Sequence, residues 1–289
     1  MNCRSRPHLK ILGSGRQGVV YDMGQRALKV SPKDISAVRR GENQPAAVEF
    51  KIHSAVQKVA RGGVPKVYGF VTCKDFVTNL KKNIKENKNK NFHDQSIVIM
   101  EKIKGLSVRD WFLAKHATLK DADLLRVIRK VLKTLEYITR KYPNFRHNDM
   151  HLDNVMIVGG QPKIIDFGWA RLSKTGTNPA VNTAVENGTA GVYGIGPSTD
   201  ARYDSHLFLK EMRTLLSKYP KFKKTRARLD LWVPEGYRDF SDRYTREGRL
   251  RYGLRSYPGL PSLHSLNAAR PMARRKVSTR EPTGLKTVM

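Results

Sequence analysis

Two short polar motifs constrain the fold of this 289-residue chain more than any other feature. The first, H-N-D-M-H-L-D-N, follows a predicted helix and precedes a predicted hairpin, and the second, D-F-G, comes after that hairpin. Asp149 and Asn154 stand five positions apart in the first motif, and Asp166 begins the second. A carboxylate suits a general base, while a carboxylate and an amide suit a Mg²⁺ ion that also binds phosphate oxygens. We therefore predict a base at Asp149 and metal ligands at Asn154 and Asp166.

A run of glycines near the N-terminus indicates a phosphate-binding turn. Gly13, Gly15 and Gly18 form the pattern G-x-G-x-x-G-x-V, which ends at Val20. In dinucleotide-binding folds a helix follows such glycines, but residues 19–21 are β-branched and aromatic and favour a strand. We therefore expect a hairpin whose turn covers phosphate groups, because glycine lets the backbone approach a ligand closely.

A lysine and a glutamate 20 residues apart complete this candidate site. Lys29 follows Ala27 by two positions in an apolar predicted strand, and Glu49 lies on a predicted helix at 46–59. A lysine inside an apolar strand is costly unless a carboxylate pairs with it. Each residue alone fits a surface charge, but the pair suits the anchoring of the α- and β-phosphates of a nucleotide.

The rest of the pattern predicts strands first and helices later. Apolar runs separated by glycines predict strands at 9–12, 19–23, 26–30, 64–72 and 96–100, and a Lys- and Asn-rich stretch at 74–95 predicts a solvated insertion. Apolar residues spaced three and four apart predict a buried helix face at 124–138, followed by a hairpin at 155–158 and 163–165 and a helix at 204–216. We expect an irregular surface segment at 175–199.

In order and spacing, these motifs resemble those of the protein-kinase superfamily over about residues 9–171. The resemblance implies an α+β fold of two lobes, with an antiparallel sheet and one helix in the N-terminal lobe and a mainly helical, shortened C-terminal lobe. It places the N-terminal lobe at 9–104, including the insertion at 74–95, and the C-terminal lobe at 105–259. A basic, flexible tail is expected at 260–289.

The resemblance also implies a reaction and its site residues. ATP and Mg²⁺ are the expected cofactors, and Ser or Thr hydroxyls of a protein are the expected acceptors of the γ-phosphoryl group. Lys29 resembles the lysine that anchors the phosphates, Glu49 its helix partner, and Asp149 the catalytic base. The other implied nucleotide contacts are Gly13, Gly15, Gly18, Val20, Ala27, the gatekeeper Met100 and the hinge from Glu101 to Ile103, with Asn154 and Asp166 on the metal.

Position 151 departs from the pattern of Ser/Thr protein kinases. His151 stands where a lysine is usual, and H-x-D-x-H-x-x-N resembles the loop of aminoglycoside and choline kinases, which phosphorylate small molecules. His151 is a further catalytic candidate, because a protonated or hydrogen-bond-donating imidazole neutralises charge on the transferred group. A small-molecule kinase is therefore the alternative function.

Two other positions concern activation by phosphorylation and the support of the catalytic loop. Asn148 replaces the arginine that in many kinases binds a phosphate on the activation segment, so activation by phosphorylation is not expected. Asp204 opens a predicted helix. It either supports the catalytic loop, as in kinases, or caps that helix, and both interpretations stay open.

The charge of the chain favours acidic or polyanionic partners. Lys and Arg number 55 and Asp and Glu 25, so the net charge is 55 − 25 = +30. This balance suits an acidic protein substrate, and a basic nucleic-acid-associated protein with a secondary kinase domain is a further alternative. The basic residues are spread along the chain with few aromatic neighbours, which does not favour base stacking. In style, the short helical lobe and basic tail are similar to the minimal kinases of large DNA viruses.

Location is inferred from three simple features. No run approaches the roughly 18 apolar residues of a membrane-spanning helix, and residues 1–10 lack the apolar core of a signal peptide. The two cysteines are too few for a disulfide framework. We expect a monomer without a membrane partner, inside the cell in the cytoplasm, or in the host cytoplasm or virion if the source is a virus.

Overall fold

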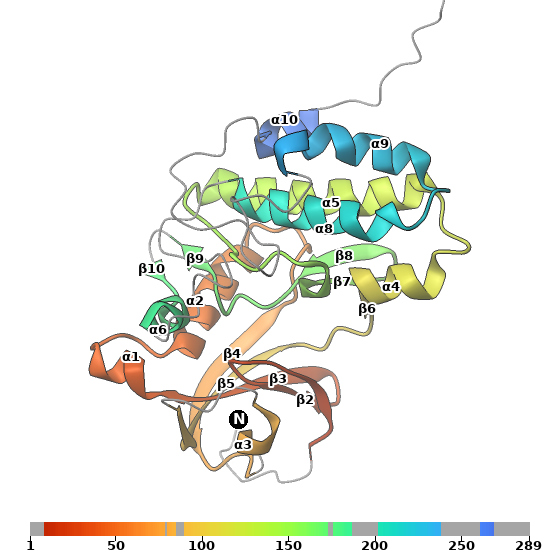
Figure 1. The fold of residues 1–289 in the computed structure, drawn as a ribbon. Helices are drawn as coiled ribbons and strands as arrows, with labels where there is room; N and C mark the ends of the chain where they lie inside the picture. The colour runs from red at the N-terminus through yellow and green to blue at the C-terminus, as the bar shows by residue number, and fades with distance from the viewer. Residues whose placement is uncertain are drawn as a thin grey trace, which may run out of the picture.

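The computed structural model describes residues 9–78, 80–84, 90–172, 176–186, 202–237 and 261–268. A five-stranded antiparallel sheet with short helices forms one lobe, and a mainly helical unit forms the other (Figure 1). The predicted two-lobed α+β fold is confirmed. The expected long helix of the first lobe is α2, which two short helices accompany.

The elements of the N-terminal lobe are β1 (Ile11–Ser14), β2 (Val19–Met23), β3 (Arg26–Asp34), α1 (Ile35–Arg39), α2 (Pro45–Gln57), β4 (Val67–Lys74), α3 (Leu80–Asn83) and β5 (Lys90–Glu101). Those that follow are β6 (Leu106–Ser107), α4 (Val108–Lys115), α5 (Asp121–Lys141), the 3₁₀ helix η1 (Leu152–Asn154), β7 (Val155–Val158), β8 (Gln161–Ile164), β9 (Arg171–Leu172), β10 (Gly176–Thr177), α6 (Pro179–Glu186), α8 (Tyr203–Ser217), α9 (Lys223–Trp232), the 3₁₀ helix η2 (Glu235–Tyr237) and α10 (Leu263–Ala268).

The register of the five-stranded sheet places the lysine strand beside the hinge. The strand order is β1-β2-β3-β5-β4, and β2 and β3 form a hairpin whose turn contains Gly24 at φ +70°. In the pairing of β3 with β5, Ala27 lies opposite Met100 and Lys29 opposite Val98. The chain therefore leaves the sheet toward the second lobe at Glu101, three residue pairs from Lys29.

The described part of the 74–95 segment, residues 74–78, 80–84 and 90–95, does not form the solvated insertion that the composition predicted. Phe76, Val77, Leu80 and Ile84 are buried in the hydrophobic cluster of the sheet, and β5 begins at Lys90. Their spacing puts the apolar side chains on one face of the segment while the Lys and Asn side chains face outward. The prediction was wrong because the average composition of the stretch hides this one-sided pattern.

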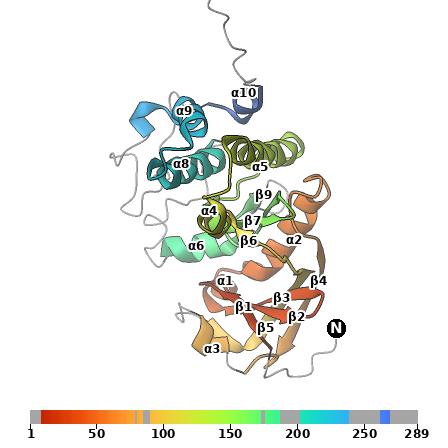
Figure 2. The same cartoon turned by 90° about the vertical axis from the view of Figure 1, so that its right-hand side faces the viewer.

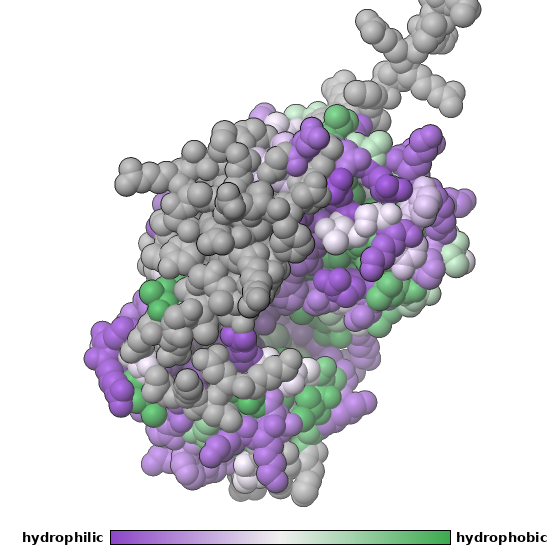
Figure 3. All heavy atoms as spheres, viewed as in Figure 1, coloured by the Kyte–Doolittle hydropathy of each residue, from purple (hydrophilic) through white to green (hydrophobic). Residues whose placement is uncertain are grey.

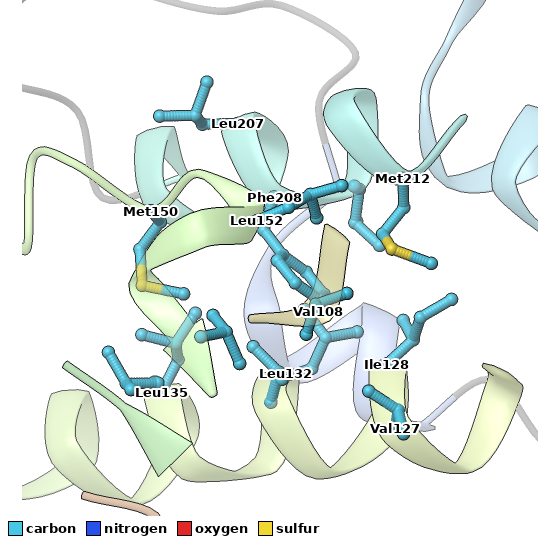
Figure 4. Packing of buried hydrophobic residues seen from close by; sticks show 14 of the residues in the cluster. Val108, Val127, Ile128, Leu132, Leu135, Met150, Leu152, Leu207, Phe208 and Met212 are labelled. Atoms are coloured by element: carbon cyan, nitrogen blue, oxygen red, sulfur yellow. The ribbon is translucent and has the colours of Figure 1, made fainter. Parts of the chain in front are cut away.

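The core of the second lobe forms around α5, as the apolar spacing predicted. Figure 4 shows Ile128, Leu132 and Leu135 on α5 directed toward Phe208 and Met212 on α8. Burial of each such side chain contributes roughly 1.5–3 kcal/mol. The loop that carries the first polar motif adds side chains to the same cluster. The motif is therefore attached directly to the core of the lobe.

Two short helices occupy segments for which no regular structure was predicted. Helix α6 lies in the 175–199 segment and buries Val181 completely. Helix α10 lies in the 260–289 segment, buries Leu266, and donates a hydrogen bond from Nδ2 of Asn267 to the Leu132 carbonyl on α5 (3.3 Å). Helices of this length do not show a clear period in the sequence. Residues 175, 187–199, 260 and 269–289 of these two predictions lie outside the described residues.

The described surface on the face of Figure 3 is mainly hydrophilic, with hydrophobic side chains in small separate patches. Figure 2 shows that α5, α8, α9 and α10 lie together at the end of the molecule opposite the five-stranded sheet. Within the described ranges, every helix is too short or too polar to span a bilayer.

We predict that Phe76→Ala lowers the free energy of unfolding by about 3–5 kcal/mol, because the ring is completely buried and its removal leaves a cavity. The exposed Lys81 on α3 provides a control, and Lys81→Ala should change stability by at most about 0.5 kcal/mol. Urea unfolding followed by circular dichroism measures both. Equal, small effects would show that this segment is solvated after all.

Candidate active site

A cavity of about 660 Å³ brings the predicted residues of both lobes together. Its lining includes nine of them: Gly13, Gly15, Gly18, Val20, Lys29, Asp149, His151, Asn154 and Asp166. The glycine turn between β1 and β2 forms one wall, and the loop that ends in η1 forms the opposite wall. Segments more than 100 residues apart in the sequence therefore share one space.

Five predicted nucleotide contacts do not line this cavity: Ala27, Glu49, Met100, Glu101 and Ile103. The side chain of Glu101 instead binds Nζ of Lys163 on β8 (2.6 Å) and accepts the Lys66 backbone N–H (2.9 Å). Burial would raise the pKa of Glu101, but the hydrogen bonds from Lys163 and Lys66 lower it below its usual range. The carboxylate thus links the hinge to the second lobe, and adenine binding through the hinge backbone stays a prediction.

The buried Lys29 forms the centre of a charge cluster with the buried Glu49 and the partly exposed Asp166. Its Nζ donates to Oε1 of Glu49 (2.8 Å) and to Oδ1 of Asp166 (2.7 Å). Burial alone would lower the pKa of Lys29, but the two carboxylates outweigh it and raise that pKa above its ordinary value. Burial raises the pKa of Glu49 despite the attraction of Lys29, whereas Asp166 keeps a lowered pKa because Lys29 outweighs its desolvation. The lysine is therefore charged and fixed in direction.

A hydrogen bond from the glycine turn fixes the D-F-G backbone. Nε2 of Gln17 donates to the Gly168 carbonyl (2.9 Å), and the Gly168 N–H donates to Oδ1 of Asp166 (3.1 Å). A Cβ atom on Gly168 would lie 1.9 Å from Oε1 of Gln17, so a larger residue at this position would displace the end of the Gln17 side chain. Asp166 has φ +60°, a left-handed conformation that aspartate adopts more readily than most residues.

Asp149 lies within reach of Asn154 and His151. Nδ2 of Asn154 donates to the Asp149 carbonyl (2.9 Å) and to Oδ2 of Asp149 (3.0 Å), and Nε2 of His151 lies 3.4 Å from the same oxygen. Nδ1 of His151 accepts the Asp153 backbone N–H (3.2 Å), so the ring proton of the neutral form belongs on Nε2. Because the amide nitrogen of Asn154 is used in this way, its oxygen is the atom suited to a cation.

Helix α8 holds the loop at both ends. Asp204 accepts the backbone N–H groups of His147 (2.7 Å) and Asn148 (2.8 Å), and Glu211, two turns later, accepts that of Leu152 (2.9 Å). The capping position of α8 belongs to Arg202, so Asp204 supports the loop and the interpretation as an N-cap is wrong. Burial raises the pKa of Asp204, opposed by the attraction of His147 and by the two N–H donors.

Several cavity residues were not predicted. Arg16, Gln17, Asp153 and Trp169 also line the cavity. Glu211 on α8 supports the loop that contains Asp149 by accepting the Leu152 backbone N–H. Glu211 was detectable, because it stands seven residues after Asp204 and so on the same helix face. The partner of Gln17 lies 151 residues away, and no local pattern indicates such a contact.

The residues present fit ATP and Mg²⁺. A glycine-lined wall, one fixed lysine and two oxygen ligands surround the cavity. Among the described residues, no group of three or more His, Cys, Asp or Glu side chains is arranged to hold a metal ion.

Comparisons with known proteins also indicate similarity to protein kinases. A family model described as the protein kinase domain matches residues 7–191, which is more than half of the chain. A protein of Acanthamoeba polyphaga mimivirus that bears the name of a serine/threonine-protein kinase is 26% identical over 223 residues. The match covers 63% of this chain and 45% of that protein, so the chain spans less than half of that relative's length.

We predict that acidification destabilises the fold through His53, whose ring packs on Phe167 of the D-F-G motif (4.7 Å between centroids). Burial lowers the pKa of His53 to about 4. Between about pH 6.5 and this value the unfolded chain binds a proton that the folded protein does not, so stability falls as the pH falls. The loss at pH 5 relative to pH 8 is about 2 kcal/mol from this group.

Urea unfolding at pH 8 and pH 5 measures this loss in the unmodified protein and in His53→Gln. The variant should lose less stability between the two pH values, by about 2 kcal/mol. His93, which is exposed and paired with Asp75, provides the control, and His93→Gln should keep the full loss. An identical pH dependence in His53→Gln and the unmodified protein would contradict the assignment.

Proposed function

We propose that this chain, which belongs to the protein kinase family, transfers the γ-phosphoryl group of ATP to Ser or Thr hydroxyls of protein substrates. One observation carries the proposal. Lys29 is held by Glu49 and Asp166 at the edge of the cavity that Asp149 and Asn154 line from the other lobe. A phosphate anchor, candidate metal ligands and a candidate base thus face one space of suitable size.

The glycine turn and Lys29 would bind the phosphates. The backbone at Gly13 and Gly15 has open space where a side chain would stand, so a phosphate can approach the turn closely. Lys29 is positively charged and aimed into the cavity by its two carboxylate partners. Because phosphoryl transfer passes through a loose transition state, such positioning and charge account for most of the catalysis.

Asn154 and Asp166 would hold Mg²⁺, which neutralises negative charge on the phosphate oxygens. Asp149 would orient the acceptor hydroxyl and accept its proton as the bond to phosphorus forms. The hydrogen bond from Nδ2 of Asn154 to Oδ2 fixes the carboxylate of Asp149 at the cavity wall, and the ring of His151 lies beside the same oxygen. The support from α8 keeps the backbone of this loop in place, so little reorganisation is needed at the moment of reaction.

His151 supports a second candidate function, a small-molecule kinase. Its ring lines the cavity beside Asp149, where it would contact the transferred group or the acceptor. The net charge of +30 supports the first candidate, because a basic surface attracts acidic proteins at long range. The two functions differ only in the acceptor, so the nature of the labelled product separates them.

We predict that Asp149→Asn lowers kcat by about 10²–10⁴-fold, because the proton acceptor is lost while the side chain keeps its shape. Nucleotide binding should be largely preserved, since Lys29 and the glycine turn are untouched. Transfer of radiolabelled phosphate from ATP in the presence of Mg²⁺ measures turnover, and calorimetry measures binding. Asp230→Asn on α9, which removes a half-exposed carboxylate far from the cavity, is the matched control and should keep full activity.

We predict that the unmodified protein labels Ser or Thr residues when an acidic protein, a basic protein and aminoglycosides are offered side by side. Phosphoamino-acid analysis identifies the labelled residue, and Asp149→Asn should abolish the label. Label on the aminoglycoside alone would instead establish the small-molecule function and make His151 the residue that determines acceptor choice.

A further inference from the structure

Helix α6, which follows the D-F-G motif, packs against the N-terminal lobe. Figure 1 shows α6 beside α1 and the start of α2, and hydrogen bonds join the same elements. Helix α2 carries Glu49, the partner of Lys29. The segment after the D-F-G motif is therefore positioned to act on the phosphate anchor through α2.

Asn178 makes the contact nearest to Glu49. Its side chain is completely buried, its Oδ1 accepts the Ala180 N–H (3.0 Å), and its Nδ2 donates to the Pro45 carbonyl (3.0 Å). In an α-helix the Pro45 carbonyl also accepts the N–H of Glu49, four residues later. One amide group thus both caps α6 and binds the turn of α2 from which Glu49 extends.

Thr183 makes a second set of contacts one turn along α6. Its hydroxyl donates to Oδ2 of the buried Asp34 (3.3 Å) and accepts from Arg40 (3.0 Å). Asp34 also receives Nζ of Lys90 (2.8 Å), and its backbone N–H donates to Gln44, the residue that precedes α2. The position of α2 is therefore connected to α6 at both its first turn and the loop before it.

A small space between α6 and α2 shows how closely α6 packs beside Glu49. Ala180 of α6 and Glu49 of α2 line the same space of about 10 Å³. A cavity needs about 10–15 Å³ to hold one water molecule, so this space holds one water molecule at most, and Glu49 is only 3% exposed. Helix α6 thus contributes to the burial that makes Lys29 the necessary partner of Glu49.

We propose that α6 is a positioning element that holds α2 with Glu49 paired to Lys29, and that Asn178 is its main contact. These neutral hydrogen bonds would replace a phosphate on the activation segment. The effect on catalysis rests on the proposed function, but whether α6 holds α2 in place is testable separately. It also accounts for Asn148, whose Nδ2 donates to the Trp169 carbonyl (2.8 Å) at the position where a phosphate-binding arginine is usual.

The sharpest test is Asn178→Asp. Aspartate caps a helix as well as asparagine, so α6 keeps its N-terminal hydrogen bond. A carboxylate cannot donate to the Pro45 carbonyl and places negative charge against that oxygen. An unmade buried hydrogen bond disfavours the packing of α6 against α2. We therefore expect kcat/KM for ATP to fall on the order of tenfold. We also expect faster hydrogen exchange at the backbone amides of α2, with little change in Tm.

Two further variants separate positioning from general stability. Val185→Ala changes an exposed side chain on the same helix and should leave activity and exchange unchanged. Asn182→Ala removes the donor to Oε1 of Glu42 (2.8 Å), which is a half-buried contact, and should lower kcat/KM less than Asn178→Asp does. This variant keeps the test informative if Asn178→Asp does not fold. Phosphatase treatment of the unmodified protein should leave activity unchanged.

The outcomes are distinguishable from those of the proposed function. An active unmodified protein with slower Asn178→Asp and exchange increased in α2 alone supports the inference. Unchanged activity and exchange in Asn178→Asp overturn it, and so does a large loss of activity on phosphatase treatment. A fall in Tm with exchange increased throughout the protein also overturns it, because the role is then structural only. If the unmodified protein transfers no phosphate, the proposed function fails, and hydrogen exchange in α2 still decides whether α6 holds that helix.

Discussion

The contact between Lys29 and the carboxylates of Glu49 and Asp166 is the interaction on which the arrangement of the two lobes depends. Lys29 and Glu49 leave water together, while Asp166 stays partly exposed, and removal of one partner from a buried pair costs about 3–5 kcal/mol. The three residues come from β3, from α2 and from the D-F-G segment. The sheet, its helix and the second lobe must therefore meet in one relative position, because any other position leaves a buried charge without its partner.

The second lobe holds the loop of the candidate base in place, while the first lobe contributes Lys29. Helix α8 packs its apolar face against α5 and directs Asp204 and Glu211 to backbone N–H groups of the loop that contains Asp149. Hydrogen bonds to a charged acceptor are worth about 1.5–3 kcal/mol, and here they hold the backbone of the loop. Gln17 then joins the glycine turn to Gly168. The candidate base, the candidate metal ligands and the glycine turn are thus all connected through the hydrophobic core or through hydrogen bonds of the backbone.

The sequence predicted what depends on local spacing and missed what depends on distant contacts. The glycine turn, the strand of Lys29, the apolar face of α5 and the two polar motifs are local, and the structure places their key residues around one cavity. The burial of Phe76 was missed because the surrounding lysines and asparagines dominate the composition of that stretch. The contact between Asn178 and Pro45 spans 133 residues, and a single sequence contains no signal for such a pairing. Glu211 is an intermediate case, since its distance of two helical turns from Asp204 indicates a shared face once the role of Asp204 is known.

The distribution of charge is consistent with the cation that we propose for the cavity of this basic chain. The chain carries a net charge of +30, yet the cavity is lined by the carboxylates of Asp149, Asp153 and Asp166 against the positive charges of Arg16 and Lys29. A polyphosphate attracted by the outer surface would meet these carboxylates at short range, where the repulsion is strongest. The proposed Mg²⁺, held by Asn154 and Asp166, would offset that repulsion. Under the proposed function, the net positive charge would raise the rate at which an anionic nucleotide arrives, and the carboxylates would favour a nucleotide that carries a metal ion.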